Sequence, residues 1–276
     1  MKHQKSSINL FSVIFYSALC LVGVQLAVGY GQLWLSEKGW IPRALLSDVG
    51  TTVLFQVICI ALCLPRYLHA PDPARRIHRK GEKRITPFEL ILVLLVSIVF
   101  IDLINNALVL VTKFVRDSAY QGIMQELSSG NRVLVILSVG VLGPVFEELL
   151  FRGILYRGIR SMGGFWVSAI LTSALWGVSH MNFTQGVATF LMGLLLCFFY
   201  ETYRSLILVI LIHMGNNIAG LFTSGSLGTM TGNLLEMLIL MGIELLLTIL
   251  ILTRLSNKNA GGFRKFDSIR ESAAGR

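Results

Sequence analysis

The chain has 276 residues, of which 54% are hydrophobic and only 14% are charged, and its formal net charge is +9. A soluble domain carries about a quarter charged residues, so this composition excludes a soluble globular protein and indicates an integral membrane protein. Seven of the 24 lysines and arginines fall between Pro65 and Arg84, and others follow Arg254. Basic clusters beside apolar segments favour membrane orientation and contact with anionic lipid over nucleic-acid binding.

The apolar segments predict an all-α, polytopic membrane fold with about eight transmembrane helices. The first segment follows Lys2 and Lys5, but its apolar core is long for a signal peptide, which favours a retained helix. Pro65 is expected to close the second helix. The polar connector from residue 112 to residue 132 is expected to carry a short interfacial helix. The expected spans are residues 8–30, 49–64, 88–111, 133–158, 165–182, 184–200, 205–222 and 234–253.

These spans group into three parts. Residues 1–132 hold the first three helices and the basic loop 65–84, and residues 133–222 hold a core of helices four to seven. Residues 223–276 hold the last helix and a polar C-terminal tail that we expect to be disordered. Eight spans put both termini on one side, and taking that side as the cytoplasm places 19 of the 24 basic residues inside. The positive-inside rule therefore predicts cytoplasmic termini, and the short loops suit a bacterial plasma membrane.

Polar side chains interrupt the apolar spans four, five and seven. A charged group deep in hydrocarbon costs ~3 kcal/mol or more unless it is paired or hydrated. Glu148 and Arg152 are four residues apart, which favours an ion pair on one helix face, whereas Glu147 points about 100° away. Glu148 and Arg152 therefore suit a bracing role, and Glu147 is free for chemistry. The full set is Glu147, Glu148, Arg152, His180, His213 and Asn217.

These residue types can form a hydrolytic site. A carboxylate and an imidazole can position and deprotonate a water, and a second imidazole and a carboxamide can donate hydrogen bonds to a developing oxyanion. His213 and Asn217 are four residues apart, so both project from one helix face. Each residue alone also has a structural reading, because intramembrane histidine and asparagine often bond a neighbouring helix. Their joint occurrence on three nearby spans favours the hydrolytic interpretation.

In order and spacing, these residues resemble the motifs of the CAAX-protease and bacteriocin-processing family of intramembrane endopeptidases, also called the Abi family. The motifs are Glu-Glu-x-x-x-Arg from Glu147 to Arg152, an aromatic-x-x-x-His from Trp176 to His180, and His-x-x-x-Asn from His213 to Asn217. The resemblance covers about residues 134–222. Trp176 stands where phenylalanine is usual, and we expect only a local repacking from this difference.

The resemblance implies an intramembrane endopeptidase that cleaves a membrane-associated protein or peptide, which is prenylated for some members of the family. It implies that Glu147 is the general base and that His180 helps to hold the attacking water. It also implies that His213 and Asn217 form the oxyanion hole, with Glu148 and Arg152 bracing the site.

The question of a metal stays open at this point. The chain has no His-Glu-x-x-His motif. Glu147, His180 and His213 could nevertheless bind zinc and leave one position for water. Catalysis by glutamate without a metal is preferred, because the asparagine and one histidine are better used as oxyanion donors.

The main alternative is a non-catalytic membrane scaffold or bacteriocin-immunity protein that binds a peptide or a membrane partner in the same pocket. A transporter is disfavoured, because the sequence shows no convincing internal repeat. The expected partners are a peptide or membrane-tethered protein substrate and anionic lipid at the basic cytoplasmic loop, with no nucleic acid.

Overall fold

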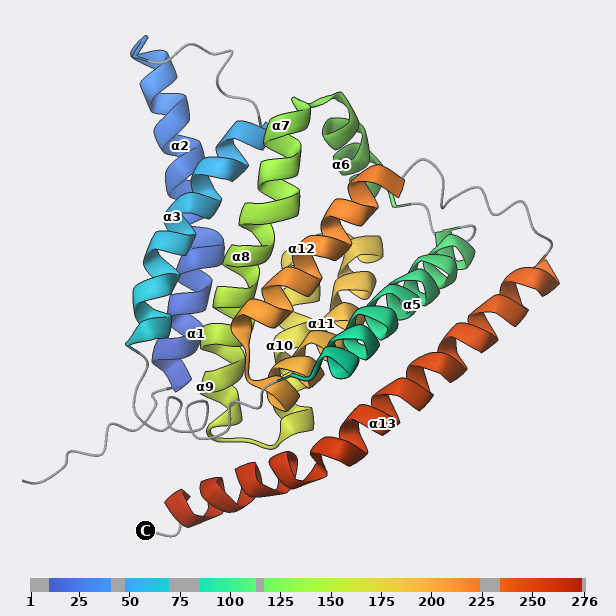
Figure 1. Cartoon of the computed structure of the whole chain (residues 1–276). Helices are drawn as coiled ribbons and strands as arrows, with labels where there is room; N and C mark the ends of the chain where they lie inside the picture. The colour runs from blue at the N-terminus through green and yellow to red at the C-terminus, as the bar shows by residue number, and fades with distance from the viewer. Residues whose placement is uncertain (1–9, 41–47, 70–84, 113–116, 224–233, 275–276) are drawn as a thin grey trace, which may run out of the picture.

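The computed structural model describes residues 10–40, 48–69, 85–112, 117–223 and 234–274, and the regular structure in these ranges is helical throughout (Figure 1). The predicted all-α polytopic fold is therefore confirmed. The segments labelled η are stretches of π-helix inside longer helices. The elements are α1 (Leu10–Ala18), η1 (Leu19–Gly23), α2 (Val24–Glu37), α3 (Asp48–Leu68), α5 (Pro87–Thr112), α6 (Ser118–Ser129), α7 (Arg132–Val135), η3 (Ile136–Leu142), α8 (Gly143–Glu148), η4 (Leu149–Tyr156), α9 (Arg157–Arg160), α10 (Phe165–Ser179), α11 (Phe183–Tyr203), α12 (Leu206–Thr223) and α13 (Leu234–Ala274).

Within the described ranges, six helices are long and apolar enough to cross a bilayer, so the protein is an integral, multi-pass membrane protein. The fifth and seventh expected spans are present as α10 and α12, which are apolar but shorter. The connector from residue 112 to residue 132 carries a short helix, α6, as expected, and its interfacial position stays a prediction. The six long spans are Phe11–Glu37, Val49–Leu68, Pro87–Val109, Arg132–Arg160, Phe183–Tyr203 and Leu234–Asn257.

Three expected boundaries are wrong. The first helix does not end at residue 30 but continues as α2 to Glu37. Helix α3 continues through Pro65 to Leu68. Because only the last turn follows the proline, little helix is disturbed, and the extra turn lets the Arg66 guanidinium donate to Ser12 Oγ at 2.8 Å. Helix α13 continues to Ala274, so the polar tail that begins at residue 257 is helical as far as Ala274 rather than disordered. Most of the basic loop, residues 70–84, lies outside the described residues, and the grouping into three parts stays a prediction.

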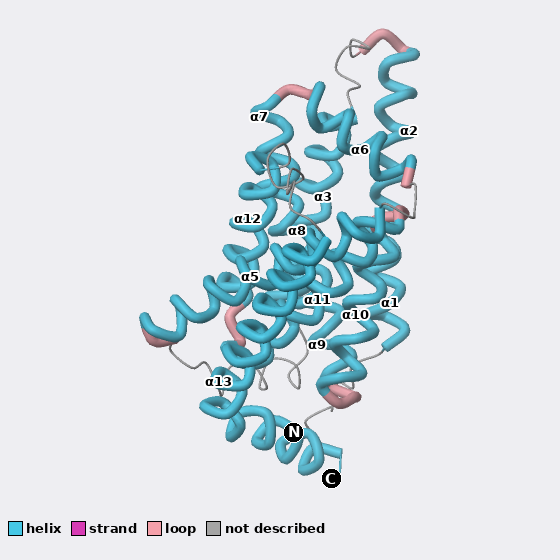
Figure 2. Tube along the Cα trace, turned by 90° about the vertical axis from the view of Figure 1, so that its right-hand side faces the viewer, coloured by secondary structure: helices cyan, strands magenta, loops and turns pink. Residues whose placement is uncertain are grey.

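The continuous helix from α7 to α9 is the centre of the bundle. Helices α1 and α3 pack against one side of it, and α10 and α12 pack against the other (Figure 1). Helix α11 lies beside α10, and α5 lies between α11 and the outermost helix α13. Figure 2 views the bundle from the side of α13, which runs across the front of the other helices. Side chains on the central helix are therefore enclosed by neighbours from four other helices.

Small residues allow α10 and α11 to approach each other closely. A Cβ atom on Gly177 would lie 2.6 Å from the carbonyl oxygen of Gly186, and one on Gly193 would lie 2.6 Å from Ser173 Oγ. Glycine is required at such contacts because any larger side chain would separate the two helices. The close packing brings α11 within reach of the polar residues of the central helix.

The turn between α10 and α11 is held by two side chains. Asn182 Oδ1 accepts a hydrogen bond from the backbone N–H of Gln185, and Asn182 Nδ2 donates to the carbonyl oxygen of His180. Asp117 accepts from the backbone N–H of Tyr120 at 3.0 Å and from that of Thr184 at 2.8 Å. These backbone donors lower the pKa of Asp117, because they bind its ionised form. One carboxylate therefore caps both α6 and α11 and fixes the turn that follows α10.

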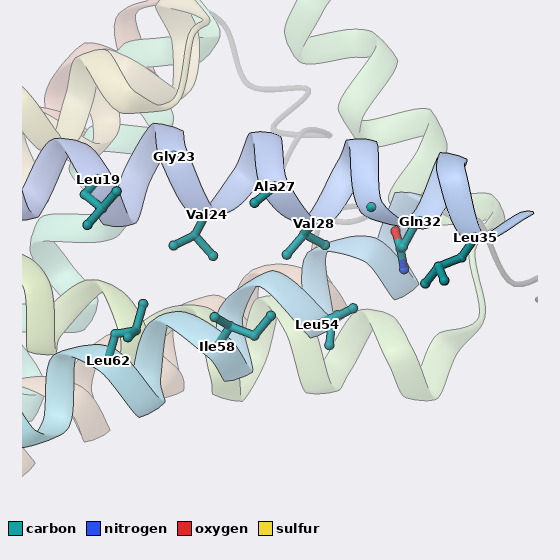
Figure 3. Close-up of a pocket in the computed structure, with 11 residues that line it drawn as sticks. Leu19, Gly23, Val24, Ala27, Val28, Gln32, Leu35, Leu54, Ile58 and Leu62 are labelled. Carbon is teal, nitrogen blue, oxygen red and sulfur yellow. The ribbon is translucent and has the colours of Figure 1, made fainter.

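An apolar groove of about 510 Å³ runs between the first helix and α3. Figure 3 shows the side chains of Val24, Val28 and Ile58 facing one another across it. The polar side chain at this groove is Gln32, whose Oε1 accepts a hydrogen bond from Thr51. The groove is lined by none of the candidate site residues, and nothing in its chemistry suggests catalysis.

Candidate active site

The adjacent acids Glu147 and Glu148 end α8, a six-residue α-helical segment between the π-helical segments η3 and η4. A π-helical turn shifts the direction in which the following side chains point, and such turns are frequent at functional sites. The central helix is therefore irregular on both sides of the acidic pair. Half of its most apolar stretch is buried inside the protein, so its polar side chains face other helices.

Glu148 is fully buried between a cation and a histidine. Its Oε1 accepts a hydrogen bond from Arg152 Nη1 at 2.7 Å and lies 2.9 Å from His213 Nδ1. Because a carboxylate only accepts, His213 Nδ1 carries the shared proton. Arg152 Nη2 also donates to the carbonyl oxygen of Gly193, at 3.3 Å. The ion pair expected from the sequence is present, and it also ties the central helix to α11 and α12.

Trp176, from α10, contacts three of these side chains. Its Nε1–H donates to Glu147 Oε2 at 2.7 Å, and the Arg152 guanidinium lies over its ring, 4.1 Å from the centroid. The His213 ring is 5.1 Å away, at 70° to the indole. The expectation of a local repacking alone is therefore wrong. The sequence did offer a signal, because a buried indole N–H requires an acceptor and phenylalanine has no such donor.

Glu147 has a different environment from its neighbour. Its side chain is 24% exposed, and its Oε2 lies 3.8 Å from His213 Nε2. The imidazole of His213 thus lies between the two acids, bonded to the buried Glu148 and facing the open Glu147. One carboxylate is enclosed and paired, and the other is accessible to water and to a ligand.

His180 joins this cluster through Trp176. It is the C-cap of α10, and its Nδ1 lies 3.0 Å from the carbonyl oxygen of Trp176. Since a carbonyl accepts, Nδ1 is protonated there, and the neutral ring keeps Nε2 as a hydrogen-bond acceptor. The Trp176 and His180 ring centroids are 6.1 Å apart.

Asn217 lies one turn beyond His213 on α12 but is bonded elsewhere. Its Nδ2 donates to the carbonyl oxygen of Val139 in η3, at 2.9 Å. Within the described residues it makes no hydrogen bond to the other candidate side chains. The structure therefore brings Glu147, Glu148, Arg152, Trp176 and His213 into direct contact, places His180 beside them, and connects Asn217 to the central helix.

The proposed zinc ligands do not form a metal site in this arrangement. Among the described residues, no three His, Cys, Asp or Glu side chains lie close enough to hold a metal ion. His180 Nδ1 and Glu147 Oε2 are both bonded to Trp176 instead. The geometry gives no three-ligand set, so we derive no step through a metal.

The fold and these contacts define a polytopic membrane protein with a partly open carboxylate inside a buried polar cluster. Residues 129–219 match the family model described as "Type II CAAX prenyl endopeptidase Rce1-like". This segment contains all six residues singled out by spacing, and Trp176 with them. The resemblance based on the three motifs is therefore confirmed over this part of the chain.

Two curated proteins are similar to the chain. An Escherichia coli protein named "Uncharacterized 24.3 kDa protein" is 28% identical over 181 residues, which is 62% of this chain and 76% of the relative. The Bacillus subtilis (strain 168) protein named "Putative membrane peptidase YdiL" is 24% identical over 84 residues, which is 30% of this chain and 34% of the relative. No solved structure matches. Together with the family match, these similarities support a membrane peptidase of the CAAX type.

Proposed function

We propose that the protein is an intramembrane endopeptidase of the CAAX-protease and bacteriocin-processing type, which hydrolyses a peptide bond of a membrane-associated protein or peptide. The observation that carries the proposal is the contrast between the two adjacent acids. Glu147 is partly open and faces an imidazole, whereas Glu148 is buried and paired with Arg152 and His213. A general base needs access to water, and a brace needs fixed partners.

In this proposal Glu147 takes a proton from a water molecule. His180 Nε2 accepts the other hydrogen of the same water and so orients its oxygen. The water oxygen forms a bond to the carbon of the scissile carbonyl, and the electron pair of the C=O bond moves to the carbonyl oxygen. Because the water is held beside its base, this geometry lowers the entropic part of the activation barrier.

The oxyanion is stabilised from α12. His213 Nδ1 donates to Glu148, and Nε2 donates to the oxyanion when the ring carries a second proton. Asn217 uses one amide hydrogen for Val139, and its second hydrogen is available to the same oxygen. The proton held by Glu147 then passes to the leaving nitrogen, the C–N bond breaks, and an acid and an amine result.

The substrate class follows from the similar proteins rather than from the geometry. The matched family model is described by its prenylated substrates, so prenylated C-terminal peptides are the first class to test, followed by unmodified peptides. The remaining proposals concern location and partners. They are cytoplasmic termini in a bacterial plasma membrane, anionic lipid at the basic loop 65–84, and no nucleic acid.

The test uses purified, detergent-solubilised protein and a panel of prenylated and unmodified peptides. We expect Glu147→Gln to lower cleavage by at least about 100-fold, because a carboxamide cannot accept the proton. The matched control is Glu236→Gln, which changes an exposed acid in the first turn of α13 and should leave cleavage unchanged. Both variants should reach the membrane in normal amounts.

Other outcomes separate the rival functions. Cleavage that persists in Glu147→Gln contradicts the assigned base. Cleavage that is lost on chelation and restored by zinc moves Glu147, His180 and His213 to metal ligands. A biological activity that is indifferent to Glu147→Gln but sensitive to surface-loop changes indicates a non-catalytic scaffold or immunity protein.

A further inference from the structure

Gln56 is a polar side chain in the middle of α3, outside the segment that matches the family model. It is only 7% exposed. Its neighbour Phe55 packs edge-on against Phe146, the residue before Glu147, with ring centroids 5.4 Å apart. This aromatic contact fixes the register of α3 against α8 beside the acidic pair.

Gly143 links the positions of Gln56 and Glu147. Gly143 lies one helical turn before Glu147 on the central helix. A Cβ atom on Gly143 would lie 2.9 Å from the carbonyl oxygen of Ser138, 3.2 Å from Gln56 Nε2 and 3.9 Å from Glu147 Oε1. The amide and the carboxylate therefore both lie close to Gly143 on the same side, where any side chain on residue 143 would collide with its neighbours. Oε1 is also the Glu147 oxygen that Trp176 does not bind, since Trp176 donates to Oε2.

The side-chain carbonyl oxygen of Gln56, Oε1, is buried without a hydrogen-bond donor from the described part of the protein. Buried amide oxygens are almost always bonded, and one without a protein partner points to a bound water or ligand. Gln32 on the neighbouring α2 shows the usual case, because its Oε1 accepts from Thr51.

We propose that Gln56 is a positioning residue that binds the hydrolytic water beside Glu147 Oε1. The inference rests on the proposed peptidase function and adds a fourth helix to the site. A carboxamide both donates and accepts, so it can hold the water while Glu147 takes the proton and continue to hold the resulting hydroxide. Gly143 contributes because any side chain at this position would crowd Gln56 and Glu147.

The first experiment measures Glu147 itself and needs no substrate. Dicyclohexylcarbodiimide, an apolar reagent, modifies protonated carboxyl groups, and mass spectrometry of the detergent-purified protein follows the Glu147 adduct across a pH series. Gln56→Glu places a second acid near Glu147, whose other neighbours are Glu148, Trp176 and His213. We expect labelling of Glu147 in this variant to persist to higher pH. Gln56→Leu removes the bonded water and should shift labelling in the same direction.

The matched control is Gln32→Leu, which makes the same change in an adjacent helix, away from the site. It should leave the labelling curve of Glu147 unchanged. In the peptide assay, Gln56→Leu should lower kcat by about 10- to 100-fold with KM changed less than about twofold, because water position rather than substrate binding is lost. A glutamine that fills space without holding the water would not lower kcat at a nearly constant KM in Gln56→Leu.

The outcomes separate the two proposals. Labelling curves of both Gln56 variants that coincide with wild type overturn the role of Gln56, whether or not any peptide is cleaved. Shifted labelling curves support the placement of Gln56 beside Glu147. If no peptide is then cleaved by the wild type, it is the peptidase function that fails.

Discussion

The central helix and the outer helix α13 both carry carboxylates inside apolar spans, but they compensate them differently. Half of the apolar stretch of the central helix is buried, against 11% for α13. On the central helix, Glu148 is bonded to an arginine and a histidine. On α13, Glu244 accepts long hydrogen bonds of 3.3 and 3.4 Å from Asn106 of α5 and also contacts the carboxyl group of Asp102. A fully buried acid is stabilised here by a cation, whereas the partly exposed Glu244 has an amide and a carboxyl group as partners.

The largest expected effect comes from removing that cation. Arg152→Met leaves Glu148 fully buried with only His213 beside it and also removes the guanidinium from the face of Trp176. Breaking a buried pair by deleting one partner costs about 3–5 kcal/mol. We expect a large fall in thermal unfolding temperature in detergent. Arg152→Lys keeps the positive charge, but a lysine cannot donate to both Glu148 and Gly193 as the guanidinium does. The unfolding temperature of Arg152→Lys should therefore lie between those of wild type and Arg152→Met.

The second prediction concerns the hydrogen bond that links Trp176 to Glu147. Trp176→Phe keeps an aromatic ring but removes the N–H that holds Glu147 Oε2 at 2.7 Å. Because the base would then sample other orientations, we expect cleavage to fall by about 10- to 100-fold. Stability should change much less than in Arg152→Met, since Glu147 stays partly open to water. Cleavage equal to wild type in Trp176→Phe would show that the indole only fills space.

The third prediction tests the outer helix. Glu244→Gln keeps an oxygen that can accept from Asn106, so stability should change by less than about 1 kcal/mol. The measurement is the same thermal unfolding experiment. A loss as large as that of Arg152→Met would contradict the contrast between the two helices, because it would mean that the outer acid is also essential to folding.

The sequence predicted what depends on local spacing. The apolar spans and the Glu148–Arg152 pair follow from composition and from the four-residue helical repeat, and both are present. The bond from Trp176 to Glu147 joins two helices, so no spacing within one helix predicts it. The same holds for Gln56, whose place beside Glu147 depends on how α3 packs against α8.

Other expectations from the sequence failed because they relied on a single local property, such as one proline or the polarity of a segment. Proline is a helix breaker in the interior, but near the end of α3 it disturbs a single turn, and the helix continues. The polar tail contains Gly261 and Gly262, which disfavour helix, yet its Lys, Arg, Glu and Ala residues favour helix, and α13 extends through them. The pairing of His213 with Glu148 was also missed, since the motif does not reveal which acid the imidazole contacts.

The smallest predicted effect concerns Asp117, which caps α6 and α11 and so holds the turn after His180. Its folded-state pKa is lowered by the backbone N–H groups of Thr184 and Tyr120. A carboxyl group whose pKa is lower in the folded state stabilises the protein above its unfolded pKa, about 3.9, and loses that contribution as pH falls through the folded value. Wild type should therefore unfold at a slightly higher temperature than Asp117→Asn at pH 6 and lose this advantage below about pH 4. A difference that stays constant from pH 6 to pH 3 would assign the effect to hydrogen-bond geometry rather than to the ionised carboxylate.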